Sequence, residues 1–198
     1  MPAVLAAAAG FRVEVVEPST EVRAVARRYF GVGALERTGE FGLIGGCGAA
    51  WAARAASRAE ADTRPACDIV VVDAEAAGVA PPPALADAAF WRALAVARPA
   101  VVGVNAIGDE AAFGALAARA REALPDGARF YECRVPRAVH GDDAAAAARQ
   151  RLLFCVRGLS AAGADAGSIA ARLQSVLDRE ARPLIDEPAL WLRELRCL

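Results

Sequence analysis

The sequence predicts a single α/β domain built on a mostly parallel sheet, with an antiparallel strand pair near its C-terminal end. Short valine-rich runs alternate with alanine-rich amphipathic segments through the first two thirds of the chain, and this alternation is typical of parallel sheets. Two strand-like segments then follow, joined by a polar, alanine-rich connection. The 198 residues are enough for one core, and no repeat or long linker divides them.

The first predicted unit is a strand followed by a helix. Residues 11–17, "FRVEVVE", form a strand that ends on an acid, and residues 20–30 form an amphipathic helix. Pro18 supplies the turn between them and Ser19 the helix N-cap. The apolar positions that recur at helical spacing are Val22, Val25, Ala26, Tyr29 and Phe30.

The middle of the chain repeats this pattern. Residues 41–46 are a weaker strand that leads into a glycine-rich turn, and 49–60 an alanine-rich helix. The run "CDIVVVDAE" (67–75) predicts a parallel strand covered on both faces and closing on Asp73. A proline loop at 81–83 leads into a helix, and residues 100–108 form a further buried strand. The helix that follows contains Phe113, Leu116, Ala117, Ala120 and Leu124.

The C-terminal third contains the antiparallel pair, 129–135 with 151–156, and then two predicted helices at 168–179 and 188–197. Ser168 and Glu187 are candidate caps, and Pro188 suits a first helical position. The last helix would place one cluster of side chains near a common face: Leu190, Trp191, Glu194, Leu195 and Leu198.

Composition excludes several classes of function. A net charge of -1 argues against a nucleic-acid partner, and no run of about 18 uncharged apolar residues is present to span a membrane. The cysteines show no metal spacing, and Cys67, Cys133 and Cys155 are expected to be buried thiols of a reducing compartment. A cytoplasmic protein is therefore expected.

The only histidine, His140, and the neighbouring Asp142 and Asp143 indicate a solvated loop rather than a site.

Two acids at strand ends are the candidate site residues. Ligands of open α/β sheets lie beyond the carboxyl ends of the strands. Glu17 ends the first strand, where a carboxylate can accept both hydroxyls of a ribose. The alternative is that Glu17 is an acid stabilised by the dipole of the next helix. Asp73 ends a later strand at the same predicted edge, where it could meet a cationic or amine group.

The segments that carry these acids resemble the spermidine-synthase-like class I methyltransferases. The segment "VEVVEPSTEVRAVARRYFGV" resembles their second strand and helix. The run from "CDIVVVDAE" to "FWRALA" resembles the fourth strand, proline loop and helix, and "ARPAVVGVNAIG" the fifth strand. The likeness covers nearly all of residues 4–198. It is greatest to family members that methylate elongation factor 1-alpha, through Asp73–Ala74–Glu75, the triple proline, "RLLFCV" and the aromatic closing helix.

This resemblance implies the seven-stranded Rossmann-like class I sheet and S-adenosylmethionine as cofactor. It gives Glu17 the ribose role, with Pro18 beside it. It places Gly46 and Cys47 where the family has an Asp-Gly that touches adenine, so that side-chain contact is missing here. It makes Asp73 the catalytic acid, near the amino-acid part of the cofactor or the acceptor amine. The implied partner is a protein substrate such as a translation elongation factor, and the family allows for oligomers.

The family's first strand and its glycine loop have no counterpart here. Residues 2–10 are too short to hold them, so the chain reads as N-terminally truncated relative to the family. The missing strand would lie between the second and fourth strands of the sheet. A competing interpretation takes "LIGGCGAAWAARAA" (43–56) as the glycine loop and helix, with Asp73 as the next strand-end acid. It leaves 13–30 as an unexplained strand and helix.

Three functions remain open at this point. The first is methyl transfer to a protein amine, impaired by loss of the glycine loop; positioning can carry this chemistry without a general base. The second is a polyamine aminopropyltransferase, which the replacement of further acids by Ala76 and Ala77 disfavours. The third is a non-catalytic remnant or partner-binding domain.

Overall fold

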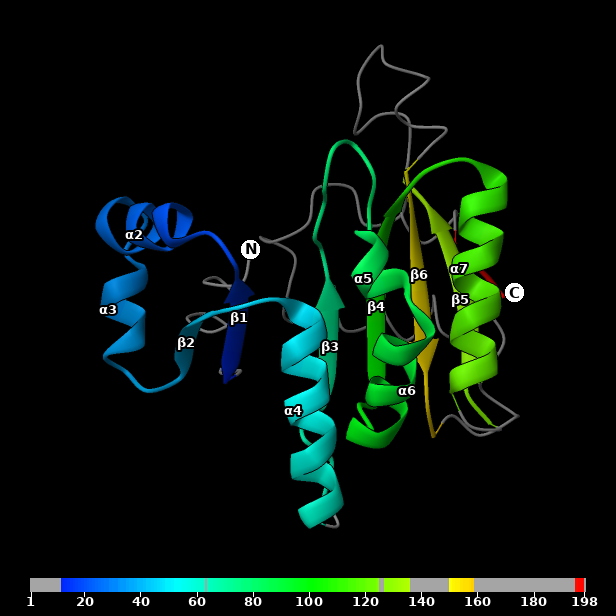
Figure 1. The fold of residues 1–198 in the computed structure, drawn as a ribbon, viewed down its shortest axis with the longest axis horizontal. Helices are drawn as coiled ribbons and strands as arrows, with labels where there is room; N and C mark the ends of the chain where they lie inside the picture. Colours follow the sequence, from blue (N-terminus) through cyan, green and yellow to red (C-terminus); the bar gives the residue numbers. More distant parts are fainter. Residues whose placement is uncertain (1–11, 63, 125–126, 136–149, 159–194, 198) are drawn as a thin grey trace, which may run out of the picture. The chain divides into compact units, whose positions relative to one another are not determined.

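The computed structural model describes residues 12–62, 64–124, 127–135, 150–158 and 195–197 (Figure 1). Contacts divide the chain into two compact units, residues 1–54 and residues 55–198. The described strands form two separate sheets, one of two strands and one of five. The α/β class is therefore confirmed, whereas the strands do not all join in one sheet.

The first unit is built on a two-stranded parallel sheet. Its elements are β1 (Val13–Glu17), α2 (Thr20–Tyr29), α3 (Val32–Glu36), β2 (Phe41–Gly45) and the start of α4 (Gly48–Ala61). β1 pairs with β2 from Val13↔Phe41 to Glu17↔Gly45. The predicted cap at Ser19 is confirmed, because its Oγ accepts a hydrogen bond of 3.1 Å from the backbone N–H of Val22.

The core of this unit is small. Val32 and Phe41 are buried, and the half-buried side chains packed on them are Val13, Val15, Ala26, Leu35 and Leu43. The predicted helix over residues 20–30 is present as α2, but none of its residues is buried. Two strands offer too narrow a surface to cover its apolar face, and Ala26 is the residue of α2 that packs against the core. The exposed apolar side chains are Val22, Val25, Tyr29 and, after the helix, Phe30.

The second unit carries a five-stranded sheet in the order β3-β4-β6-β5-β7. Parallel pairing joins β3 to β4. β6 lies antiparallel to both β4 and β5, which confirms the predicted antiparallel pair. The elements in chain order are β3 (Ile69–Val72), α5 (Pro83–Ala86), α6 (Ala88–Ala97), β4 (Val101–Ile107), α7 (Glu110–Ala123), β5 (Arg129–Arg134), β6 (Gln150–Val156) and β7 (Leu195–Cys197).

Helices α6 and α7 cover one face of this sheet and form the main core with it (Figure 1). Apolar residues of these helices recur at helical spacing and pack on alternate strand residues. Cys133 and Cys155 are buried as predicted, and Cys67 is half-buried. Fully buried side chains include Trp91, Leu94, Val102, Val104 and Leu153.

The predicted parallel strand within residues 67–75 is confirmed as β3, but the prediction that it is covered on both faces is wrong. Val70 and Val72 are buried, but Ile69 is 49% and Val71 68% exposed. A continuous apolar run indicates that a strand can be buried, but it does not predict which of its faces are covered. The side chains on one face of β3 are buried, and those on the opposite face are exposed.

The predicted closing helix is wrong at its end. Leu195–Cys197 is a short strand, β7, that pairs antiparallel with Tyr131–Cys133 of β5. Pairing with a neighbouring strand overrides a helical pattern of only a few residues. The other C-terminal predictions lie outside the described residues, as do His140, Asp142 and Asp143. Among the helices that are described, none combines the length and the apolar character needed to cross a membrane.

Candidate functional site

Glu17 lies at the carboxyl edge of the β1–β2 sheet, as predicted. Its half-buried carboxylate accepts a 2.8 Å hydrogen bond through Oε1 from the backbone N–H of Ser19, at the start of α2. Glu17 therefore does interact with the start of the following helix, which was the alternative role considered for it. A carboxylate has about four lone-pair sites, so this single bond leaves acceptor capacity for the two hydroxyls of a ribose.

Arg23 brings a positive charge to the same edge, and the sequence alone did not point to it. Its Nη1 donates to the carbonyl oxygens of Glu17 and Pro18, the latter at 2.9 Å, and its Nη2 donates to Thr20 Oγ1 at 3.0 Å. The guanidinium lies against Gly45, where an added Cβ would be 3.0 Å from Arg23 Cζ. A residue with a side chain at position 45 would displace this contact.

Gly46 and Cys47 shape the turn between β2 and α4. Gly46 has a φ of +139°, which favours glycine, and nothing lies within 4 Å of a Cβ built there. Cys47 is exposed, and its Sγ accepts from the N–H of Ala50 at 3.4 Å, so it caps the start of α4. Neither residue offers a carboxylate.

Asp73 follows β3 at the carboxyl edge of the second sheet, and two amide side chains stand behind it. Asp73 Oδ1 accepts a 2.9 Å hydrogen bond from Asn105 Nδ2 of β4. Asn105 Oδ1 in turn accepts a 3.0 Å hydrogen bond from Gln150 Nε2 of β6. The three residues come from three adjacent strands. An asparagine inside the apolar run "AVVGVNAIG" was the one available sequence signal for this chain of bonds.

The segment after Asp73 is folded back onto the end of β4. Ala76 and Val79 exchange two backbone hydrogen bonds of 2.9 and 3.1 Å around a tight turn. Ala77 and Gly78, at the centre of this turn, have positive φ angles of 52° and 76°. Ala80 then pairs with Ile107, whose N–H donates to Ala80 O at 2.8 Å. These bonds fix the loop that starts at Asp73.

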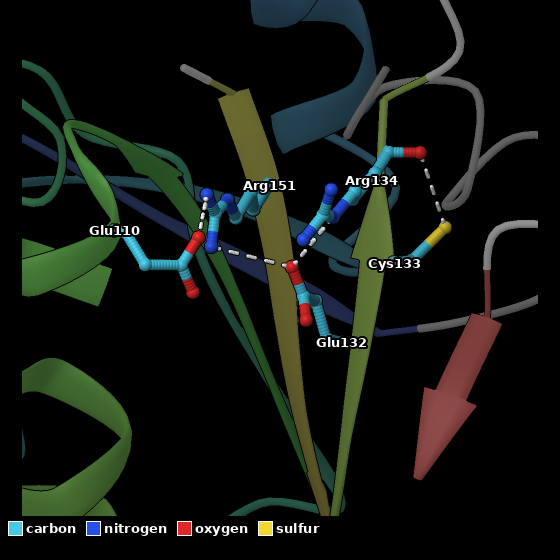
Figure 2. A network of polar contacts seen from close by, with 5 residues as sticks. All are labelled: Glu110, Glu132, Cys133, Arg134 and Arg151. Atoms are coloured by element: carbon cyan, nitrogen blue, oxygen red, sulfur yellow. Dashed lines mark hydrogen bonds and ion pairs between the residues drawn. The ribbon is translucent and has the colours of Figure 1, made fainter. Parts of the chain in front are cut away.

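A charged network lies on the helix-covered face of the same sheet (Figure 2). Arg151 of β6 is 7% exposed; its Nη2 donates to Glu110 Oε2 at 2.6 Å, and its Nη1 lies 3.4 Å from Glu132 Oε1. The guanidinium also lies 5.1 Å from the centre of the Phe113 ring. Arg134 joins through a 3.2 Å contact to Glu132. Two acids and two arginines thus compensate one another.

Local contacts set the ionisation of this region. The hydrogen bond from Arg151 lowers the pKa of Glu110, and the same bond raises the pKa of Arg151. Burial raises the pKa of the Cys155 thiol to about 12, so Cys155 stays protonated at neutral pH and is not a nucleophile.

The predicted site residues therefore fall into two groups. Glu17, Pro18, Gly46 and Cys47 share the carboxyl edge of the β1–β2 sheet, and Asp73 lies at the carboxyl edge of β3 in the other sheet. No cluster of three or more potential metal ligands occurs in the described part of the chain. No protein-family model matches this sequence, and no curated protein is significantly similar to it.

Proposed function

We propose that the chain is an S-adenosylmethionine-dependent methyltransferase domain that acts on a protein amine, either a lysine or an N-terminus. Its strand order carries this proposal. If a single parallel strand were inserted between β1 and β3, the orders β2-β1 and β3-β4-β6-β5-β7 would form one sheet of eight strands, and the seven strands other than the edge strand β7 would follow the order of the family's sheet. The resemblance places the family's first strand between its second and fourth, which correspond to β1 and β3.

The residues at the β1–β2 edge fit one end of this cofactor. Glu17 keeps acceptor capacity for ribose hydroxyls, and the open space beside Gly46 admits a close approach to backbone. When bound, the cofactor would supply an electrophilic methyl group. The backbone N–H groups that a glycine loop would contribute are not among these residues, which is why we expect weak binding.

At the carboxyl edge of the five-stranded sheet, we assign to Asp73 the role of binding the acceptor amine. Its side chain is exposed, and within the described residues only Oδ1 has a hydrogen-bond partner. An ionised carboxylate in this state can accept an N–H of an amine through Oδ2. Positioning of a deprotonated amine is sufficient for methyl transfer. The likeness to the C-terminal domain of methyltransferase-like protein 13 suggests elongation factor 1-alpha as the first substrate to assay.

Isothermal titration calorimetry with S-adenosylmethionine tests the proposal. We expect binding by the unmodified chain and about tenfold weaker binding by Glu17→Gln, because a charged acceptor for the ribose is lost. Glu14→Gln is the matched control, since Glu14 lies in the same strand and contacts Trp51 instead. Absence of heat at millimolar cofactor would contradict the proposal. Turnover of putrescine with decarboxylated S-adenosylmethionine would favour an aminopropyltransferase.

A non-catalytic partner-binding domain is the second candidate. The observation that favours it is the exposed apolar set on and after α2, where Val22 is 52%, Tyr29 65% and Phe30 72% exposed. Exposed apolar patches of this kind mark interaction surfaces in many proteins. Failure of cofactor binding with an intact fold would support this candidate over the enzyme.

A further inference from the structure

We infer that Asn105 and Gln150 are positioning residues that hold the Asp73 carboxylate ready for a cationic amine. The identification of that amine as a methyl acceptor rests on the proposed function, in which the bound ammonium must first lose one proton to water so that its nitrogen has a lone pair to accept the methyl group. The hydrogen-bonded series Gln150–Asn105–Asp73 is called the amide relay below.

The chemistry of the three side chains fixes the direction of the amide relay. An ionised carboxylate can only accept hydrogen bonds, so Asp73 requires the Nδ2 end of Asn105 to face it. The Oδ1 end of Asn105 must then point the other way, and it needs a donor. Gln150 supplies that donor through Nε2. Each amide is therefore held in one orientation by its neighbour, and the acid holds the first.

The positions of the three residues in the sheet make the amide relay rigid. Asn105 lies within β4, and Gln150 begins β6, which is hydrogen-bonded to β4 along seven residue pairs. Both side chains are half-buried, whereas Asp73 is exposed at the strand end. Strand-borne groups position a terminal carboxylate more accurately than a loop alone would. The hydrogen bond from Asn105 to Oδ1 thus orients the carboxylate of Asp73 and leaves Oδ2 for a ligand.

The charge of the amide relay selects the class of ligand. Asn105 and Gln150 are neutral, so Asp73 contributes the single negative charge. Arg151 follows Gln150 in β6 and points to the opposite face because strand side chains alternate. Arg151 is also engaged by Glu110 and Glu132, so it does not neutralise Asp73. The carboxylate of Asp73 thus keeps its charge and can pair with an ammonium group, such as that of a lysine side chain; Glu75, two residues further along the chain, is also exposed.

Amine binding can be tested on the full chain without cofactor by NMR, with n-butylammonium chloride as the probe and sodium chloride at equal ionic strength as the salt control. We expect n-butylammonium to shift the side-chain amide signals of Asn105 and Gln150. Asp73→Asn should abolish this response. Asn105→Leu should weaken binding, read from backbone signals around Asp73, about tenfold, because a hydrogen bond to a charged group is lost.

Matched variants separate positioning from packing. Leu152→Val is the control, because Leu152 lies directly opposite Asn105 in β6 and has no polar group. It should bind n-butylammonium like the unmodified chain. Gln150→Met keeps the side-chain length, removes the donor to Asn105 and should weaken binding about threefold. It also provides the test if Asn105→Leu fails to fold.

The outcomes distinguish this inference from the proposed function. Equal shifts with sodium chloride, or unchanged affinity in both Asn105→Leu and Gln150→Met, would overturn the inference even if the chain methylates a protein. An amine response that depends on Asp73 and Asn105, without any S-adenosylmethionine binding, would support the amide relay and refute the methyltransferase proposal. If methylation occurs, Asn105→Leu should raise KM for the amine and leave the cofactor Kd unchanged.

Discussion

At the scale of single residues, Arg98 joins two helices through an unusual backbone conformation. It ends α6 with a left-handed φ of 58°. Its Nη2 donates to the carbonyl oxygens of Ala59, Asp62 and Arg64 at 2.9, 2.9 and 3.2 Å, at and beyond the end of α4. A cation there satisfies carbonyl groups that have no partner within their helix. The side chain thus offsets the strain in its own backbone.

Two substitutions at this position should separate these effects. Arg98→Ala loses the guanidinium bonds and keeps the left-handed strain, so we expect a loss of about 2 kcal/mol in the free energy of unfolding. Arg98→Gly loses the same bonds but relieves the strain, and it should be about 1 kcal/mol more stable than Arg98→Ala. Urea denaturation measures both, with the exposed Arg92→Ala as control. Equal stability of the two variants would contradict the strain argument.

At the scale of elements, strand β6 depends on the charged network around Arg151. Glu132 and Arg151 are both nearly buried, at 8% and 7% exposure, and each compensates the charge of the other. Glu110 adds the shortest of these contacts, from the first residue of α7. A buried pair of this kind contributes little over apolar residues, whereas removal of one partner leaves a buried charge.

A double-mutant cycle tests that dependence. Arg151→Met should lower the free energy of unfolding by about 3 kcal/mol, because Glu132 is left buried with the partly exposed Arg134 as its remaining partner. The double variant with Glu132→Met should lose less than the sum of the two single losses. Arg134→Met, at a side chain 45% exposed, should cost less than about 1 kcal/mol. Strict additivity of the two buried substitutions, measured by urea denaturation, would show that the charges are not coupled.

Elements with strong local signals could be predicted from the sequence, and those set by distant neighbours could not. β4 and β6 have long apolar runs, and Ser19 marks the start of α2 by its own hydrogen bond. The exposure of Val71 depends on which helices cover β3, and the pairing of Leu195 depends on β5. Neither is encoded in nearby residues.

In the candidate site, too, positions with local sequence signals could be predicted, and contacts between distant residues could not. The positions of Glu17 and Asp73 at strand ends could be predicted because strand ends are recognisable in sequence. The contacts of Arg23 with Glu17 and Pro18 were not found, because an arginine in the first turns of a helix resembles any surface arginine. Gln150 could be connected to Asp73 only through the register of three strands.

At the scale of the whole molecule, the two sheets differ in how well their strands are supported. β4 and β6 each have a hydrogen-bonded strand on both sides, whereas β1 and β2 have one described partner each. The core under β1 and β2 holds two buried residues, Val32 and Phe41. Local opening costs less where few apolar contacts and few strand partners must be broken.

Hydrogen exchange followed by mass spectrometry should reveal this difference. Peptides from β4 and β6 are expected to exchange about tenfold or more slowly than peptides from β1 and β2. Under the proposed function, addition of S-adenosylmethionine should slow exchange in β1 and in the turn at Gly46. Uniform exchange of both sheets would mean that the chain opens as one cooperative unit, contrary to this expectation.

The open side of β3 has a practical consequence for any preparation of this chain. Ile69–Val72 contains no proline and no charged residue, and two of its four aliphatic side chains are exposed. Among the described strands β3 pairs only with β4, so its other backbone edge is a template onto which another extended chain can add. Concentrated samples should therefore self-associate through β3 unless something occupies that side, so the onset of aggregation on concentration will report whether it is covered.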